Sequence, residues 1–274
     1  MKRIAALAAL LVGGSLAAAS APAFADTSIT VAGSTALLPL VKDAAGVYQT
    51  QHSDVKISVS GGGSGTGINQ AAAKAVDIGD SDILAPTHPE LYDSRVAVIG
   101  FSVIVNPSVG VKNLTRKQIQ DLFSGKTANW KEVGGADQKV VIINRTRGSG
   151  TRVVFEKTVM APEKVSEAGL SEDATGTVIS VVKQTPGAIS YAAFSGTKAN
   201  PNTVTEVSIG GVAPDDANVL DGKYPFWSYE HMFTNGPPTG EVSRFIAFVQ
   251  TRTDLIKKNY FIKITDMKVK ETDR

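Results

Sequence analysis

Hydrophobic positions change their spacing repeatedly along the chain, and each change marks a boundary between predicted elements. Alternating or short continuous apolar runs predict strands, whereas apolar residues three and four positions apart predict amphipathic helices. The order strand, loop, helix recurs over most of the chain, which is typical of α/β proteins with a parallel sheet. The predicted strands span 28–32, 55–59, 76–79, 96–105, 139–143 and 188–191, and the predicted helices span 37–48, 68–75, 115–123, 152–160, 178–183 and 241–257.

The two ends of the chain depart from this repeat. Lys2 and Arg3 precede an apolar run rich in Ala and Leu, which ends at the small-x-small sequence Ala23-Phe24-Ala25. This pattern predicts a secretory signal peptide over residues 1–25, and the run is too short and too rich in glycine for a membrane anchor. The tail 257–274 is rich in charge, and we expect it to be a solvated end.

Composition narrows the possible functions. The chain has 274 residues, with 28 Lys and Arg against 26 Asp and Glu. Two of the basic residues lie in the predicted leader, so the mature chain is neutral, which argues against nucleic acid as a partner. Cysteine is absent, which excludes disulfides, thiolate metal sites and a Cys nucleophile. His52, His88 and His231 have no partner at ligand spacing, and we expect them at the surface or in turns.

Three loops share one design, because each follows a predicted strand, precedes a predicted helix and consists of Gly, Ser and Thr. Helix N-termini present unpaired N–H groups, glycine lets an anion approach the backbone, and hydroxyls add donors. Arg145 adds a full positive charge beside the third loop. Helix capping alone also explains each loop, but together with Arg145 they favour one shared oxyanion site. The loops are Gly33-Ser34-Thr35, Gly63-Ser64-Gly65-Thr66-Gly67 and Gly148-Ser149-Gly150-Thr151.

Asp82 is unexpected near an anion, because a carboxylate repels negative charge. It becomes useful if the anion carries a proton, which an ionised Asp accepts in a hydrogen bond. Phosphate near neutral pH always carries a proton and sulfate carries none, so a bare carboxylate selects phosphate over sulfate. The alternative is that Asp82, like Asp80, only caps a helix or solvates a turn.

In this order and spacing, the motifs resemble those of the periplasmic phosphate-binding proteins of bacterial ABC importers. The resemblance covers most of the mature chain and implies an α/β, two-domain type II periplasmic-binding-protein fold with the ligand cleft between the domains. It places one domain at 26–102 plus 230–274 and the other at 103–229, with hinges near 98–105 and 226–233. The motifs are VAGSTALLPL at 31–40, GGGSGTG at 61–67, VDIGDSD at 76–82, FSGKTANWKEVGG at 123–135, RTRGSGTR at 145–152 and PGAISY at 186–191.

The resemblance also implies a function and a site. The protein would be a periplasmic monomer that captures inorganic phosphate and delivers it to a membrane permease of an ABC importer. It would use no metal and no cofactor, bind no nucleic acid and catalyse no reaction. Asp82 would accept the phosphate proton. The implied ligand-binding residues are Thr35, Ala36, Ser64, Asp82, Arg145, Ser149, Gly150 and Thr151.

Other functions stay open at this point. The same fold could bind another tetrahedral oxyanion, or act as an extracytoplasmic phosphate sensor or adhesion protein. A weak phosphatase would need a metal cluster or an activated nucleophile, and the sequence shows neither. Some family members carry an acidic residue where this chain has Arg147. Arg147 therefore either makes the entrance of the site more positive or points to solvent.

Overall fold

The structure is a computed structural model that describes residues 27–272 and residue 274. The predicted signal peptide at 1–25 lies outside the described residues. The strands are β1 (Thr27–Gly33), β2 (Val55–Ser60), β3 (Ile78–Ser81), β4 (Leu91–Val105), β5 (Asn113–Leu114), β6 (Val141–Arg145), β7 (Leu170–Glu172), β8 (Ala188–Ala193), β9 (Thr205–Ile209) and β10 (Trp227–Asn235). The helices are α1 (Leu38–Gln51), α2 (Ser64–Ala72), α3 (Arg116–Ser124), α4 (Gly150–Phe155), α5 (Thr175–Gln184), α6 (Phe194–Thr197), α7 (Asp216–Leu220), α8 (Gly240–Thr251) and α9 (Thr253–Lys258).

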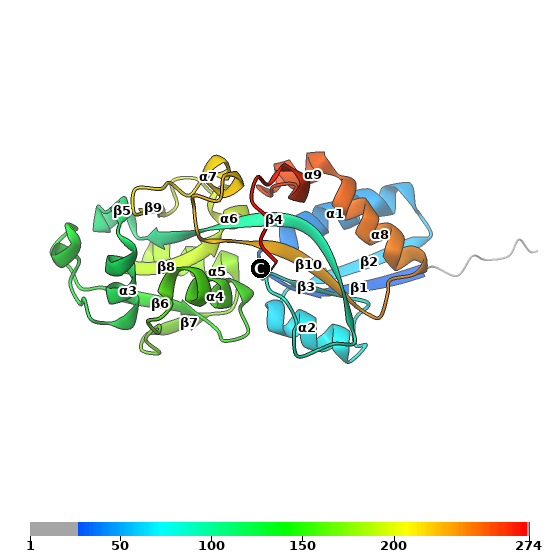
Figure 1. The fold of residues 1–274 in the computed structure, drawn as a ribbon, viewed down its shortest axis with the longest axis horizontal. Coiled ribbons are helices and arrows are strands. Elements are labelled where there is room, and N and C mark those ends of the chain that lie inside the picture. The colour runs from blue at the N-terminus through cyan, green and yellow to red at the C-terminus, as the bar shows by residue number, and fades with distance from the viewer. Residues whose placement is uncertain (1–26, 273) are drawn as a thin grey trace, which may run out of the picture.

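These elements form two lobes that lie side by side along the long axis of the molecule (Figure 1). We call the part with β1–β3, α1, α2, α8 and α9 the first lobe, and the part with β5–β9 and α3–α7 the second lobe. The long strands β4 and β10 run from the first lobe toward the second (Figure 1). The α/β architecture predicted from the alternation of strands and helices is therefore confirmed.

Within the described residues, ten strands form one sheet in the order β2-β1-β3-β10-β4-β8-β6-β7, with β9 paired to β4 and β5 paired to β9. Strands are parallel inside each lobe, as predicted: β1 with β2 and β3, and β6 with β7 and β8. The connecting strands β4 and β10 are antiparallel to each other. Along β4, residues up to Gly100 pair with β10, and residues from Phe101 pair with β8.

Helices cover both faces of the sheet because strands in such a sheet are apolar on both sides. In the first lobe, α1 and α8 lie on one face and α2 on the other (Figure 1). In the second lobe, alternate residues of β8 face different layers: Ala192 packs with α5, and Tyr191 packs with Phe155 of α4. The rings of Tyr191 and Phe155 stack at 4.2 Å. Trp130 and Trp227 are fully buried, as expected for core residues.

Two predictions about the C-terminal part are wrong. The single helix predicted at 241–257 is two helices, because Arg252 leaves helical geometry at φ −80° and ψ 75° and pairs with Asp254. The predicted solvated tail is instead packed on the connecting strands. Ile262 exchanges two main-chain hydrogen bonds of 2.9 Å with Val98 of β4. The final residue, Arg274, lies over the Trp227 ring at 4.2 Å, so this tail fastens both connecting strands.

Local signals near the helix starts are mostly confirmed. Thr115 caps α3 and forms a capping box with Gln118, as the sequence predicts. α2 begins four residues earlier than expected, at Ser64, so the glycine-rich loop supplies the first turn of the helix. The helix predicted at 152–160 begins at Gly150 and continues from Phe155 as a π-helical turn over Glu156–Met160.

Candidate functional site

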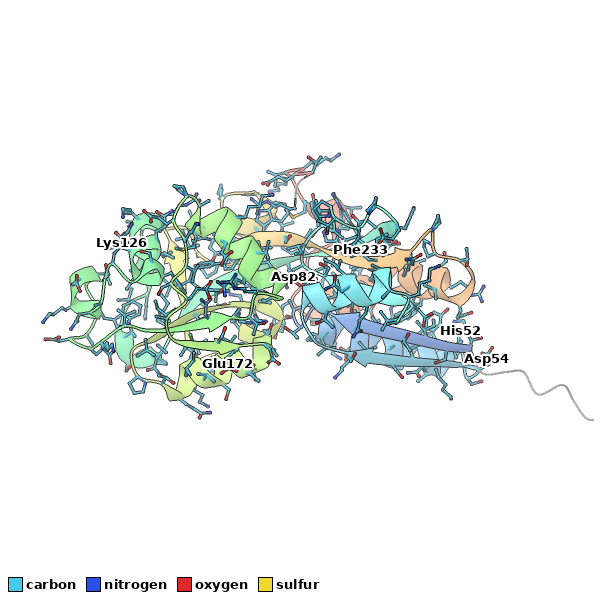
Figure 2. The ribbon with its side chains drawn as sticks, turned by 90° about the horizontal axis from the view of Figure 1, so that it is seen from below. His52, Asp54, Asp82, Lys126, Glu172 and Phe233 are labelled. Atoms are coloured by element: carbon cyan, nitrogen blue, oxygen red, sulfur yellow. The ribbon has the colours of Figure 1, made fainter. Side chains whose placement is uncertain are left out.

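Asp82 lies at the junction of the two lobes (Figure 2). It follows β3 and is 2% exposed. Its carboxyl accepts hydrogen bonds from Ser34 of the first lobe and from Thr151 Oγ1 of the second lobe, the latter at 2.8 Å. Parallel strands end at the same edge of a sheet, which is why the three predicted loops meet at this carboxyl.

The first loop is held by its own hydroxyl. Ser34 Oγ accepts from the main-chain N–H groups of Ala36 and Leu37, each at 3.1 Å, while it donates to Asp82. Gly33 is required here, because a Cβ at this position would lie 2.1 Å from the carbonyl oxygen of Asp80. The Ser34 hydroxyl therefore holds the turn that precedes α1 and contacts Asp82 at the same time.

The second and third loops touch each other across the two lobes. Gly65 N donates to Gly148 O at 3.0 Å. A Cβ on Gly150 would lie 2.2 Å from Ser64 Oγ and 2.9 Å from Asp82 Cβ, so only glycine permits this approach. Ser64 Oγ accepts from Asp82 N at 2.9 Å, and both Ser64 and Gly150 are buried.

Ser149 caps α4, because its Oγ accepts from Arg152 N at 3.3 Å. The capping alternative considered for the loops thus applies to this oxygen. The same hydroxyl keeps its hydrogen for donation, since an oxygen that accepts in a cap can still donate. Capping and anion contact are therefore compatible in one residue.

Arg145 ends β6 and is 1% exposed, so its charge lies inside the protein. Carbonyl oxygens of the last residue of β7 and of the residue after it hold the guanidinium, with Nε at 3.2 Å from Glu172 O and Nη2 at 2.9 Å from Asp173 O. Nη2 also lies 3.3 Å from Thr35 Oγ1 of the first lobe. Nη1 is buried and makes no hydrogen bond to the described residues. A buried donor without a partner is costly, and it is the clearest sign of a place for an anion.

Burial shifts the pKa values of both charged groups. Desolvation raises the pKa of Asp82, and the hydroxyls of Ser34 and Thr151 and the charge of Arg145 oppose this rise. Desolvation also lowers the pKa of Arg145, although Asp82 nearby favours its charged form. The two opposite charges therefore offset part of the cost of burying each other.

The structure brings all eight predicted site residues to the junction. Those of the first lobe are Thr35, Ala36, Ser64 and Asp82, and those of the second are Arg145, Ser149, Gly150 and Thr151. Arg147 lies apart from them: its side chain is 83% exposed and pairs with Glu167 at 3.2 Å. Of the two orientations considered for Arg147, the structure therefore has the outward one.

Three residues at the site were missed by the sequence analysis. Ser34 belongs to the first loop and contacts Asp82 directly. Thr175 starts α5, and its main-chain N donates to Thr35 Oγ1 at 3.2 Å. The sequence Ala174-Thr175-Gly176-Thr177 at the start of α5 is a fourth helix start made of small and polar residues, and this signal could have identified it. Glu230 of β10 is fully buried next to Asp82, and no local pattern indicates that.

The expectation for His231 is wrong, because its side chain is fully buried and its Nδ1 lies 2.8 Å from Asp93 Oδ1. His88 pairs with Glu90 near the surface, and His52 stacks on Tyr48. Among residues 27–272 and 274, no three His, Cys, Asp or Glu side chains form a group that could hold a metal ion. The helices in this part of the chain are all too short or too polar to cross a membrane.

Comparisons with known proteins agree with this architecture. Residues 18–253 match the model of the PBP superfamily domain. The phosphate-binding protein PstS of Bacillus subtilis is 40% identical over 253 residues, which cover 89% of this chain and 83% of the relative. A structure from Clostridium perfringens, described as a phosphate ABC transporter substrate-binding protein with bound phosphate, has a TM-score of 0.81 and 30% identity, covering 87% of this chain and 100% of that one. An ABC-type phosphate transport receptor from Vibrio cholerae shares the fold, with a TM-score of 0.66 and 24% identity over 86% of this chain and 99% of that one. The chain therefore belongs to the phosphate-binding proteins of the PBP superfamily.

Proposed function

We propose that this protein captures inorganic phosphate outside the cytoplasm and delivers it to the permease of an ABC importer. The proposal is supported by the names of its relatives and by the bound phosphate of the Clostridium perfringens structure. Its family consists of transport components, so the protein is a binding protein and not an enzyme. The observation that carries the proposal is the meeting of Arg145 and Asp82, both buried, among hydroxyls from both lobes.

Each group has a distinct role in this proposal. Arg145 attracts the anion and donates from Nη1, the nitrogen that makes no hydrogen bond to described residues. Neutral donors from the loops complete the coordination, which we assign to Thr35, Ala36, Ser64, Ser149, Gly150 and Thr151. Asp82 accepts the proton that phosphate carries. Sulfate has no proton to offer, so it would leave a buried carboxylate facing a second negative charge.

Binding requires the lobes to separate and close, because ligands come from both of them. We propose that domains 26–102 plus 230–274 and 103–229 rotate about β4 and β10, near 98–105 and 226–233. Bonds such as Thr151–Asp82 would then form around the trapped anion. We further propose that the protein acts as a periplasmic monomer and does not bind nucleic acid.

Calorimetric titration of anion-free protein with phosphate, sulfate and arsenate tests this function. Phosphate is expected to bind with a large preference over sulfate at neutral pH. A preference for sulfate would identify a different oxyanion as the ligand, and no heat with any of the three would contradict the proposal. Size-exclusion chromatography with light scattering tests the monomer separately, and a stable dimer would contradict that part.

A further inference from the structure

Behind the Asp82 carboxyl lies a group of acidic side chains that the proposed function does not use. Asp80 is at the end of β3 and Glu230 is in β10, and both are 0% exposed. β3 and β10 are paired neighbours in the sheet. Ser228, two residues before Glu230 on the same face of β10, donates to Asp82 O at 2.8 Å, so this face of β10 packs against Asp82.

Neither Asp80 nor Glu230 has a hydrogen-bond donor nearby. Both oxygens of each carboxyl are buried and accept no hydrogen bond from the described residues. In the antiparallel pairing of β10 with β3, His231 is opposite Ser81, so Glu230 comes next to Asp82. Two ionised carboxylates buried next to each other would repel each other with no proton between them. One proton on Glu230 removes the repulsion and turns the contact into a hydrogen bond.

The acceptor capacity of Asp82 agrees with this arrangement. A carboxylate offers about four lone-pair positions on its two oxygens. Ser34 and Thr151 occupy two of them, one on each oxygen. A proton donated by Glu230 fills a third, and one position remains for the proton of the bound anion.

We propose that Glu230 carries a proton at neutral pH and donates it to Asp82, which keeps Asp82 ionised as the acceptor that selects phosphate. Glu230 is thus a positioning residue for selectivity, and this inference rests on the proposed function. Burial and the neighbouring carboxyls raise the pKa of Glu230 well above its ordinary value, and burial does the same for Asp80. The hydrogen bond from Glu230 lowers the pKa of Asp82, against the effect of burial.

None of the charged side chains described around Glu230 and Asp82 is a cation that pairs with Glu230. β3 and the residue after it contribute only the carboxyls of Asp80 and Asp82. Arg145, from β6, acts on Asp82 and makes its contacts with Glu172, Asp173 and Thr35. His231, next in β10, bonds to Asp93 of β4. No cation among the described residues is paired with Glu230. The protonated form of this buried carboxyl is therefore lower in free energy than the ionised form.

The inference predicts how selectivity depends on pH. When Asp82 takes up a proton, it can donate to sulfate, and the phosphate-to-sulfate affinity ratio falls. Glu230→Leu removes the donor, so Asp82 takes up a proton at higher pH, and the midpoint of this fall should rise by about one to two pH units. Glu230→Gln keeps an N–H donor toward Asp82, so its midpoint should match that of the wild type.

Isothermal titration of both anions from mildly acidic to neutral pH measures these midpoints. Met232→Ala is the matched control, because it opens a buried cavity in the same strand without removing a donor to Asp82. It should lower thermal stability and leave the midpoint in place. The inference is overturned by an unchanged midpoint in Glu230→Leu, by an equal shift in Met232→Ala, or by a midpoint at lower pH in Glu230→Gln, which would mean that Glu230 is ionised.

Infrared spectroscopy of the anion-free protein provides a test that does not depend on phosphate. Wild type at neutral pH should show more protonated carboxylic acid absorption than Glu230→Gln. Equal absorption in the two proteins would overturn the inference even if phosphate binds as proposed. If the wild type did not bind phosphate, the proposed function would be contradicted, but the infrared result on Glu230 would stand.

Discussion

The two lobes contribute opposite chemistry to the same site. The first lobe brings hydroxyls and the Asp82 carboxyl, with Asp80 and Glu230 buried behind it. The second lobe brings the guanidinium of Arg145 and the hydroxyl of Thr151. The second lobe thus supplies the positive charge that attracts an anion. The first lobe supplies the carboxylate that repels an unsuitable anion.

This difference indicates that affinity and selectivity are separable properties of the molecule. A cation attracts any oxyanion, so it strengthens binding without distinguishing protonated from unprotonated ligands. A carboxylate distinguishes them but adds little attraction. Because the two groups are on different lobes, the proposed site needs both lobes, and the proposed closure would bring attraction and selection together.

The largest expected effect is the loss of charge from the second lobe. Arg145→Ala should weaken phosphate and sulfate binding by a similar factor, roughly tenfold to a hundredfold, because a hydrogen bond to a charged group contributes about 1.5–3 kcal/mol. Titration calorimetry measures both affinities. If only phosphate binding weakened, Arg145 would take part in selection, and the division between the lobes would be wrong.

The second prediction concerns the contact between the lobes. Gly150→Ala adds a methyl group where a Cβ would lie 2.2 Å from Ser64 Oγ, so the lobes must close less completely. Overpacking of this kind costs roughly 1–3 kcal/mol, which should weaken binding of both anions. Gly176→Ala is the control, since a Cβ there meets no atom within 4 Å. Equal phosphate affinity in Gly150→Ala and Gly176→Ala would show that closure at Gly150 is not needed.

The third prediction concerns stability and pH. Because burial raises the folded-state pKa of Asp80 above its unfolded value, its contribution to stability is full below the unfolded pKa and is lost as pH rises toward the folded pKa. Asp80→Asn does not titrate, so it should be more stable than wild type at neutral pH, by about 1.4 kcal/mol for each unit by which the pKa is raised. The gain should shrink in acid. Urea unfolding at the two pH values measures it, and a gain that is constant with pH would contradict a raised pKa of Asp80.

The smallest effect is expected at the rim of the second lobe. Arg147 is exposed and pairs with Glu167, an interaction that is typically worth about 0–1 kcal/mol. Arg147→Ala should therefore change the phosphate dissociation constant by less than about fivefold. A loss as large as that in Arg145→Ala would mean that Arg147 contacts the anion.

The architecture and the three loops could be predicted from the sequence because they depend on local patterns. Apolar spacing predicts the strands, and Gly, Ser and Thr before a helix predict loops that gather at one sheet edge. The break at Arg252 was not predicted, because the apolar spacing continues through it. The packed tail was missed because its charge is conspicuous, whereas its few buried apolar residues, Phe261, Ile262 and Met267, have no regular spacing.

The buried position of Glu230 next to Asp82 could not be predicted in the same way. Glu230 lies in a strand whose residues from Trp227 to Thr234 are all buried, and a charged residue in such a strand would ordinarily be placed on an exposed face. Its position next to Asp82 joins segments almost 150 residues apart, and His231 is buried in the same strand. Only the pairing of β10 with both β3 and β4 brings these groups together.

The most direct test of the account is the phosphate-to-sulfate affinity ratio of wild type and Asp82→Asn, measured at one neutral pH and one ionic strength. The amide can still accept through its oxygen and can also donate, so phosphate affinity should fall only modestly while sulfate binding improves. We expect a clearly smaller ratio in Asp82→Asn than in wild type. A ratio equal to that of the wild type would contradict the central claim that the buried carboxylate of the first lobe selects the anion.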